Sequence, residues 1–220
     1  MKIEIRNRPG FAVVYAKIAA GETITAESGA MASMSTHLQI KTKFNGGFFR
    51  GLLKKFFGSE SLFVNDFTCP MNSEEAELVL TQPTPGDICE LELNNSSFNL
   101  QPGAYIAHTG DVSLGVRWAG LASFFNKEGL FKLVVSGTGK VYFGAYGCIV
   151  KRKITGEFIV DSGHLVGYSK GINLTMGLAG GIFSSFFGGE GIVSRLKGDG
   201  EIYMQTRNLS ALASLTNKYL

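Results

Sequence analysis

Three stretches of the chain alternate apolar and polar residues at the same distance from a glycine. The reference glycines are Gly29, Gly103 and Gly163, and the alternation runs from the ninth to the fifteenth residue after each. A period of two is typical of a β-strand with one buried face. We therefore predict one strand per stretch, with the first residue of each set at the same buried position. The sets are Leu38, Ile40, Thr42 and Phe44; Val112, Leu114, Val116 and Trp118; and Ile172, Leu174, Met176 and Leu178.

The correspondence continues beyond these strands. A Phe-Phe pair followed by a polar, glycine-containing loop and a glutamate occurs in each copy, at 56–62, 124–130 and 186–192. Copies two and three then carry Gly-x-Gly, at 137–139 and 198–200, which we interpret as hairpin turns. Self-similarity at fixed offsets indicates an internal repeat.

The sequence therefore predicts an all-β protein with three pseudo-equivalent antiparallel units around one core. Residues 1–220 form a single domain, with units at about 21–82, 95–147 and 156–207. The tail, 208–218, is predicted to be a C-terminal helix capped by Asn208 or Ser210, with Leu209, Leu212 and Ala213 on one face.

The composition indicates many tight turns, and the cysteines and the N-terminal residues bear on the cellular compartment. The chain has 29 Gly and 17 Phe, a pairing that suggests many turns between strands that bury aromatic residues. The three cysteines share no metal-type spacing and are expected to be reduced, and the N-terminal residues Met1–Arg6 alternate like a strand rather than a signal peptide. We expect a cytoplasmic protein.

Neither a membrane-spanning segment nor a nucleic-acid interface is predicted. The uncharged stretch Gly171–Gly189 contains six glycines, and its counterparts in the other copies carry lysines and arginines that hydrocarbon would not tolerate. The net charge of +3 is too small to indicate a nucleic-acid partner.

No catalytic, metal or cofactor site is predicted. His37, His108 and His164 stand eight, five and one residues after their reference glycines, so no two are repeat-equivalent. No carboxylate or thiol cluster has metal-ligand spacing, and nucleophile motifs are absent. We expect structural or surface histidines and no enzyme activity.

Repeat-equivalent carboxylates are the first candidate for a working group. Glu60, Glu128 and Glu190 each follow a Phe-Phe pair by three residues. Each could accept hydrogen bonds from loop N–H groups that no sheet satisfies, which is a purely structural role. Alternatively, the three could converge on a cation or a basic partner.

The aromatic segment of copy one is the second candidate. As a short helix, it would place Phe48, Phe49, Leu52, Phe56 and Phe57 on one side and basic residues on the other. Such a helix can lie on an anionic membrane or dock a partner. Alternatively, it caps the sandwich or forms a subunit contact, which is favoured because copies two and three lack the basic face.

The motifs resemble those of a bacterial and archaeal family that also contains the altered-inheritance-of-mitochondria type proteins. The resemblance rests on Glu27–Met31, Pro85–Ile88 and the glutamate loops Gly58–Leu62 and Gly188–Ile192, and it spans nearly the whole chain. Copy two departs from it at Asn126–Lys127. The resemblance implies a β-sandwich similar to the tryptophan-RNA-binding attenuation protein (TRAP), whose subunits assemble in rings, and no known enzyme activity.

We therefore expect a non-catalytic binding or scaffolding protein that acts as a homo-oligomer and carries no cofactor. Two alternatives remain open: a small-ligand or RNA-binding ring protein, which rests on fold analogy alone, and a peripheral membrane-associated organiser. The sequence does not identify a protein partner.

Overall fold

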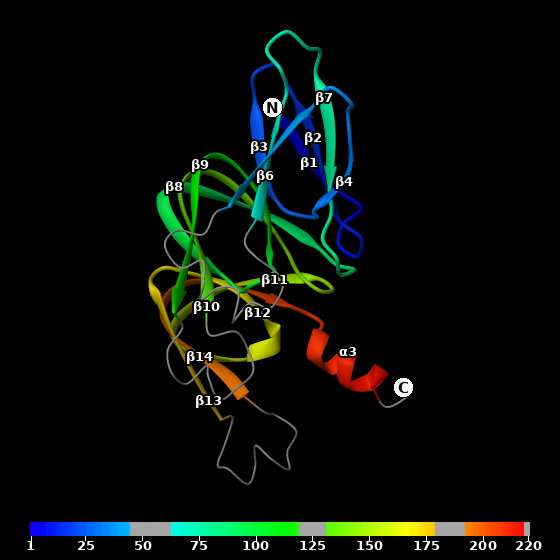
Figure 1. The fold of residues 1–220 in the computed structure, drawn as a ribbon. Helices are drawn as coiled ribbons and strands as arrows, with labels where there is room; N and C mark the ends of the chain where they lie inside the picture. Colours follow the sequence, from blue (N-terminus) through cyan, green and yellow to red (C-terminus); the bar gives the residue numbers. More distant parts are fainter. Residues whose placement is uncertain (45–62, 119–130, 179–191, 218–220) are drawn as a thin grey trace.

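The chain is built from antiparallel strands with one helix at its C-terminal end (Figure 1). The computed structural model describes residues 1–44, 63–118, 131–178 and 192–217. The all-β prediction and the C-terminal helix are both confirmed.

The middle of the chain shows the basic arrangement in its simplest form. β8 (Ile88–Leu100) and β9 (Tyr105–Trp118) are joined by a turn at Gly103, whose φ of 80° favours glycine. β10 (Phe131–Gly144) returns between them and pairs with both strands. The third strand is therefore the centre of a three-stranded unit.

The same pairing recurs in the last third of the chain. β11 (Ile149–Asp161) leads through a 3-10 turn, Ser162–His164, to β12 (Leu165–Ser169) and β13 (Ile172–Leu178). β14 (Ile192–Gln205) then pairs with β11 along one edge and with β12 and β13 along the other.

In the first third, each long strand is replaced by two shorter ones. β6 (Phe63–Thr68) pairs with β3 and β5, and β7 (Ala76–Leu80) pairs with β2 and β4. β1 adds a further strand on the outside of β2. The remaining bounds are β1 Lys2–Arg6, β2 Val13–Ile18, β3 Thr23–Glu27, β4 Met31–Met34 and β5 Gln39–Phe44. The strands β8 and β11 begin at Ile88 and Ile149, before the predicted starts of the second and third units at about 95 and 156. The predicted boundaries of the three units stay predictions.

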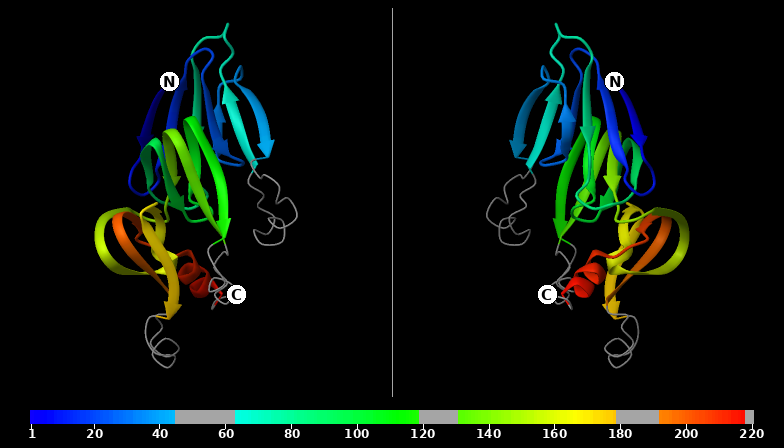
Figure 2. Two further views of the ribbon diagram at one scale, coloured as in Figure 1. Left: turned by 90° about the vertical axis from the view of Figure 1, so that its left-hand side faces the viewer. Right: turned by 90° about the vertical axis from the view of Figure 1, so that its right-hand side faces the viewer.

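The three parts of the chain are stacked along the long axis of the molecule (Figures 1 and 2). They are joined by short strand contacts: two residue pairs connect β3 to β9, and three connect β12 to β8. As a result, the strands form a four-stranded sheet, β1-β2-β7-β4, and a ten-stranded sheet that runs through all three parts.

The buried side chains do not form the one core that we predicted. They form three clusters, one centred on each part of the chain, each of which takes in residues at the joints. Tyr142, for example, belongs to the first cluster, and Tyr203 belongs to the second. The single-core prediction is wrong because the units are stacked end to end, so each unit packs its apolar side chains mainly into its own cluster.

The predicted shared buried position of the three copies is confirmed. Leu38, Val112 and Ile172 are 5%, 8% and 4% exposed. The alternation fails in the first copy, where Ile40 is 46% exposed. β5 is one of the end strands of the ten-stranded sheet. It pairs only with β6 among the described strands, so it is less covered than the strands inside the sheet.

The Gly-x-Gly segments are not hairpin turns, so that prediction is wrong. Both lie in the middle of long strands, at Gly137–Gly139 of β10 and Gly198–Gly200 of β14. Gly137 has a φ of 132°, and a Cβ there would lie 2.0 Å from the carbonyl oxygen of Asp111. The β10–β8 register shifts at this point. The glycines therefore allow bent strands to approach each other closely.

Candidate functional site

All the candidate site residues from the sequence lie outside the described residues. They are Phe48, Phe49, Leu52, Phe56, Phe57, Glu60, Glu128 and Glu190. The structure does show where their three segments start and end. Each connects the paired ends of two strands, which are Phe44 with Phe63, Trp118 with Phe131, and Leu178 with Ile192.

Helix α3 (Leu209–Thr216) is the most unusual exposed feature of the described chain. Its N-cap is Asn208, whose side-chain oxygen accepts hydrogen bonds from the N–H groups of Ser210 and Ala211. The Asn208 amide also donates to the Asp161 carboxylate at 3.4 Å, which ties the cap to the turn after β11. The sequence prediction of this cap is confirmed.

No residue of α3 is buried. The helix contains no charged residue, and its three leucines, spaced three residues apart, face solvent; Leu209, Leu212 and Leu215 are 53%, 40% and 53% exposed. Figure 1 shows the helix beside the strands rather than on a sheet face. The sequence indicated the first two leucines but missed Leu215, which the spacing of three could have revealed.

An exposed helix of this kind is poorly stable by itself. Isolated helices shorter than about 12–15 residues are marginal in water, and helices in proteins owe most of their stability to packing of an apolar face. α3 has eight residues and no ion pair along its surface. A surface that covers the leucines would therefore stabilise the helix.

A buried polar cluster lies at the joint between the first and second parts of the chain. The Tyr105 hydroxyl is 2.7 Å from Nδ1 of His108 and 3.2 Å from the carbonyl oxygen of Thr25. The Thr25 hydroxyl donates to Asp66, which also pairs with Lys43. Because these residues come from β3, β5, β6 and β9, the cluster fixes the short β3–β9 contact.

The surroundings of His108 keep its imidazole neutral at physiological pH. The side chain is 6% exposed. Burial lowers its pKa to about 4; Asp66 acts in the opposite direction, and Lys43 lowers the pKa further. The residue therefore has a structural role as a neutral hydrogen-bonding partner.

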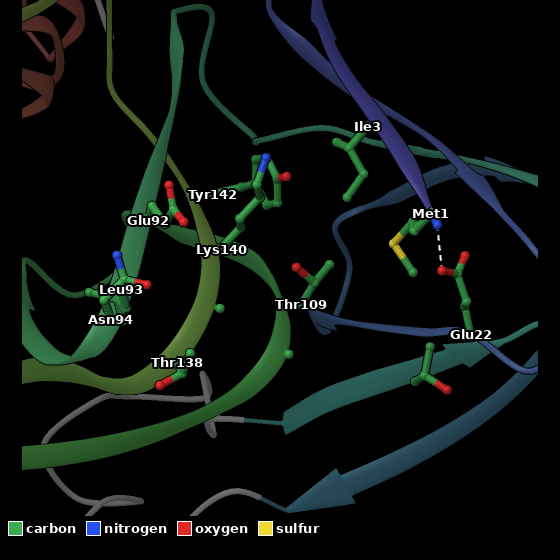
Figure 3. A pocket seen from close by; sticks show the side chains of 13 residues that line it. Met1, Ile3, Glu22, Glu92, Leu93, Asn94, Thr109, Thr138, Lys140 and Tyr142 are labelled. Carbon is green, nitrogen blue, oxygen red and sulfur yellow. Dashed lines mark hydrogen bonds and ion pairs between the residues drawn. The ribbon is translucent and has the colours of Figure 1, made fainter.

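A pocket of about 500 Å³ opens where β1 approaches the bends of β8, β9 and β10 (Figure 3). Three of its charged groups are already paired: the N-terminal amine and Glu22 with each other, and Lys140 with Glu90 at 2.8 Å. The volume suits a small molecule. This pocket could not be predicted from the sequence because residues far apart in the chain form it. Its lining is Met1, Ile3, Glu22, Thr23, Glu92, Leu93, Asn94, Thr109, Gly110, Thr138, Gly139, Lys140 and Tyr142.

Two features are absent from the described residues. No three His, Cys, Asp or Glu side chains within residues 1–44, 63–118, 131–178 and 192–217 are grouped so that they could hold a metal ion. Over those same ranges, no helix is long and apolar enough to cross a membrane. The stretch after Gly171 begins as strand β13, as predicted.

The fold and its exposed helix define an all-β protein of three stacked strand units with an apolar C-terminal helix. The chain belongs to the AIM24 (mitochondrial biogenesis) family, whose family model matches residues 3–207. The family expected from the motifs is thus confirmed.

Two comparisons extend over the whole chain. An uncharacterized protein of Streptococcus pyogenes serotype M6 is 29% identical over 231 residues, covering 100% of this chain and 91% of the relative. A crystal structure of a Streptococcus pyogenes protein, determined by a structural genomics consortium, has a TM-score of 0.80 and 27% identity. It covers 100% of this chain and 99% of the other.

Proposed function

We propose that this chain is a non-catalytic binding or scaffolding protein that self-associates through α3. The observation that carries the proposal is the uncharged helix, with three exposed leucines and no buried residue. An apolar surface of this kind on a short helix is typical of an interaction site. The occupant we propose is α3 of a second copy.

The charge pattern of α3 favours a second copy over a membrane or a charged partner. A helix that lies on a membrane surface usually carries lysines and arginines on its polar face, whereas α3 has serines and a threonine there. A helix without charge is complementary to a second neutral helix. Two antiparallel copies would place leucines against the small residues between them, as a two-fold interface requires.

The size of the apolar surface predicts a weak dimer. Burying the exposed halves of three leucines on each of two helices amounts to about three whole leucine side chains. At about 1.5–3 kcal/mol each, this contributes roughly 5–9 kcal/mol. Association itself costs about 4–15 kcal/mol. At the favourable ends of these ranges about 5 kcal/mol remains, so we expect a dimer no tighter than hundreds of micromolar, unless other surfaces add to it.

A dilution series in sedimentation velocity tests the proposal. The triple variant L209Q/L212Q/L215Q should remain monomeric at concentrations where the parent dimerises, with unchanged β circular dichroism, because no α3 residue is buried in the monomer. Gln is chosen because it keeps helix propensity. The matched control is F11S, which removes an apolar side chain that is 74% exposed elsewhere. A parent that stays monomeric throughout, or a triple variant that dimerises equally, would overturn the proposal.

Small-ligand binding is the second candidate, and the pocket beside β1 favours it. A TRAP-like ring and RNA binding rest on resemblance alone, and a membrane organiser would depend on the segment 45–62. A cytoplasmic location is in keeping with three free cysteines. Thermal-shift measurements with a library of small polar metabolites test the pocket; the T109V/T138V variant should lose any shift that the parent shows.

A further inference from the structure

Two cations, Lys132 and Arg117, are cross-strand neighbours at the joint between the second and third parts of the chain. Lys132 and Arg117 form no ion pair with any carboxylate in the part of the chain that the structure describes. Eight other basic side chains do form ion pairs. These are Lys2, Arg6, Arg8, Lys17, Lys43, Lys140, Lys151 and Arg195.

The two side chains lie on the same face of the sheet. Lys132 of β10 is directly opposite Arg117 of β9 in the antiparallel register, and residues opposite each other project to the same side. The ammonium group of Lys132 donates to the Tyr168 hydroxyl at 3.2 Å and lies 5.4 Å from the centre of its ring. Because Tyr168 is on β12 and only 2% exposed, it holds the ammonium group in place.

This position is electrostatically costly without a counter-ion. Lys132 is half-buried, and burial together with the nearby Arg117 guanidinium lowers its pKa. Burial raises the pKa of Tyr168 to about 12, so its hydroxyl stays neutral and cannot compensate the charge. Partly desolvated charges in proteins are normally paired. An anion between the two cations would relieve both the desolvation and the repulsion.

We propose that Lys132, Arg117 and the Tyr168 hydroxyl form a binding site for a phosphate group, free or as a small phosphate ester. The three groups supply different kinds of donor from three strands. The Arg fork can bind two phosphate oxygens, and the Lys ammonium binds as a point charge. The Tyr168 oxygen accepts from Lys132, and the phenolic hydrogen has no acceptor among the described residues. It is therefore free to donate to a third oxygen.

Calorimetric titration of the full chain at constant ionic strength tests the site. Inorganic phosphate and glycerol 3-phosphate are the probes, and chloride is the reference. We expect saturable binding of at least one phosphate probe, weakened at least about tenfold in K132M and in R117Q, as expected for loss of one charge-assisted contact. K153M is the control because it removes an exposed lysine of β11 that forms no ion pair in the described structure.

Two further variants separate this site from its alternatives. Y168F keeps the ring but removes the hydroxyl, and it should weaken phosphate binding without abolishing it. E128Q tests whether a carboxylate of the chain itself is the counter-ion. Absence of saturable binding to the parent, equal binding to K132M, or binding that appears only in E128Q would overturn the proposal. Tighter binding of the ester than of inorganic phosphate would support a phosphate-ester ligand.

Discussion

At the scale of single residues, His108 shows how the joints between the stacked units are held together. Only two residue pairs connect β3 to β9, so side chains supply much of what keeps the strands together. His108 does so as a neutral imidazole beside the Tyr105 hydroxyl. Because the imidazole is buried in its neutral form, protonation at low pH should destabilise this joint.

Acidification should destabilise the protein through His108. The pKa of His108 in the folded protein, about 4, is below the ordinary histidine value of 6.5, so the unfolded chain binds the proton first as the pH falls. The contribution of His108 to the free energy of unfolding is therefore constant above about pH 6.5. It falls as the pH drops toward 4, by about 1.4 kcal/mol per pH unit and by roughly 3 kcal/mol in total. Urea unfolding of the parent and of H108Q at pH 7 and pH 4.5 measures the difference.

Other groups also titrate over this range, so the comparison between variants decides the result. The parent should lose more stability than H108Q, while H37Q, which alters an exposed histidine, should follow the parent. If the parent and H108Q lose the same free energy of unfolding, His108 is not the acid-sensitive group.

At the scale of secondary-structure elements, the glycines inside the long strands decide the shape of each unit. Replacing Gly137 by Ala would place a Cβ 2.0 Å from a backbone oxygen of β9 at a φ of 132°. We expect G137A to lower the free energy of unfolding by about 2 kcal/mol or more.

Thermal and urea unfolding can measure this loss. G10A is the matched control, because nothing lies within 4 Å of a Cβ at Gly10, and it should be within about 0.5 kcal/mol of the parent. A G137A variant as stable as G10A would show that the strands do not need this close approach.

Local patterns of sequence predicted the elements better than their connections. The strands after Gly29, Gly103 and Gly163 and the Asn208 cap were predictable because alternation and capping depend on neighbouring residues. The Gly-x-Gly segments were misread because a hairpin turn and a strand bend both favour glycine. The pocket, the His108 cluster and the Lys132 site could not be predicted, because each joins strands that are distant in sequence.

The aromatic segment of the first unit gives a separate prediction. F48S/F49S/L52S should lower the sedimentation-derived mass without unfolding the sheet, if this segment contributes a subunit contact. Loss of β circular dichroism would show instead that it is core. A folded variant that keeps its mass but no longer binds anionic vesicles bound by the parent would favour a membrane contact.

At the scale of the whole molecule, three stacked units leave sheet edges and one apolar helix without described partners. β5 and β11 are the ends of the ten-stranded sheet. β5 carries Lys41 and Lys43, and lysines on an edge strand oppose pairing with another chain. α3 has no such charge. Self-association is therefore expected at the helix rather than at this edge.

Isotope-filtered methyl NMR on a mixture of ¹³C-labelled and unlabelled chains tests this most directly, because only contacts between two copies give a signal. At a concentration where the parent dimerises, we predict intermolecular contacts to the methyl groups of Leu209, Leu212 and Leu215. They should disappear on dilution. A monomer at every concentration, or intermolecular contacts confined to residues outside α3, would contradict the account.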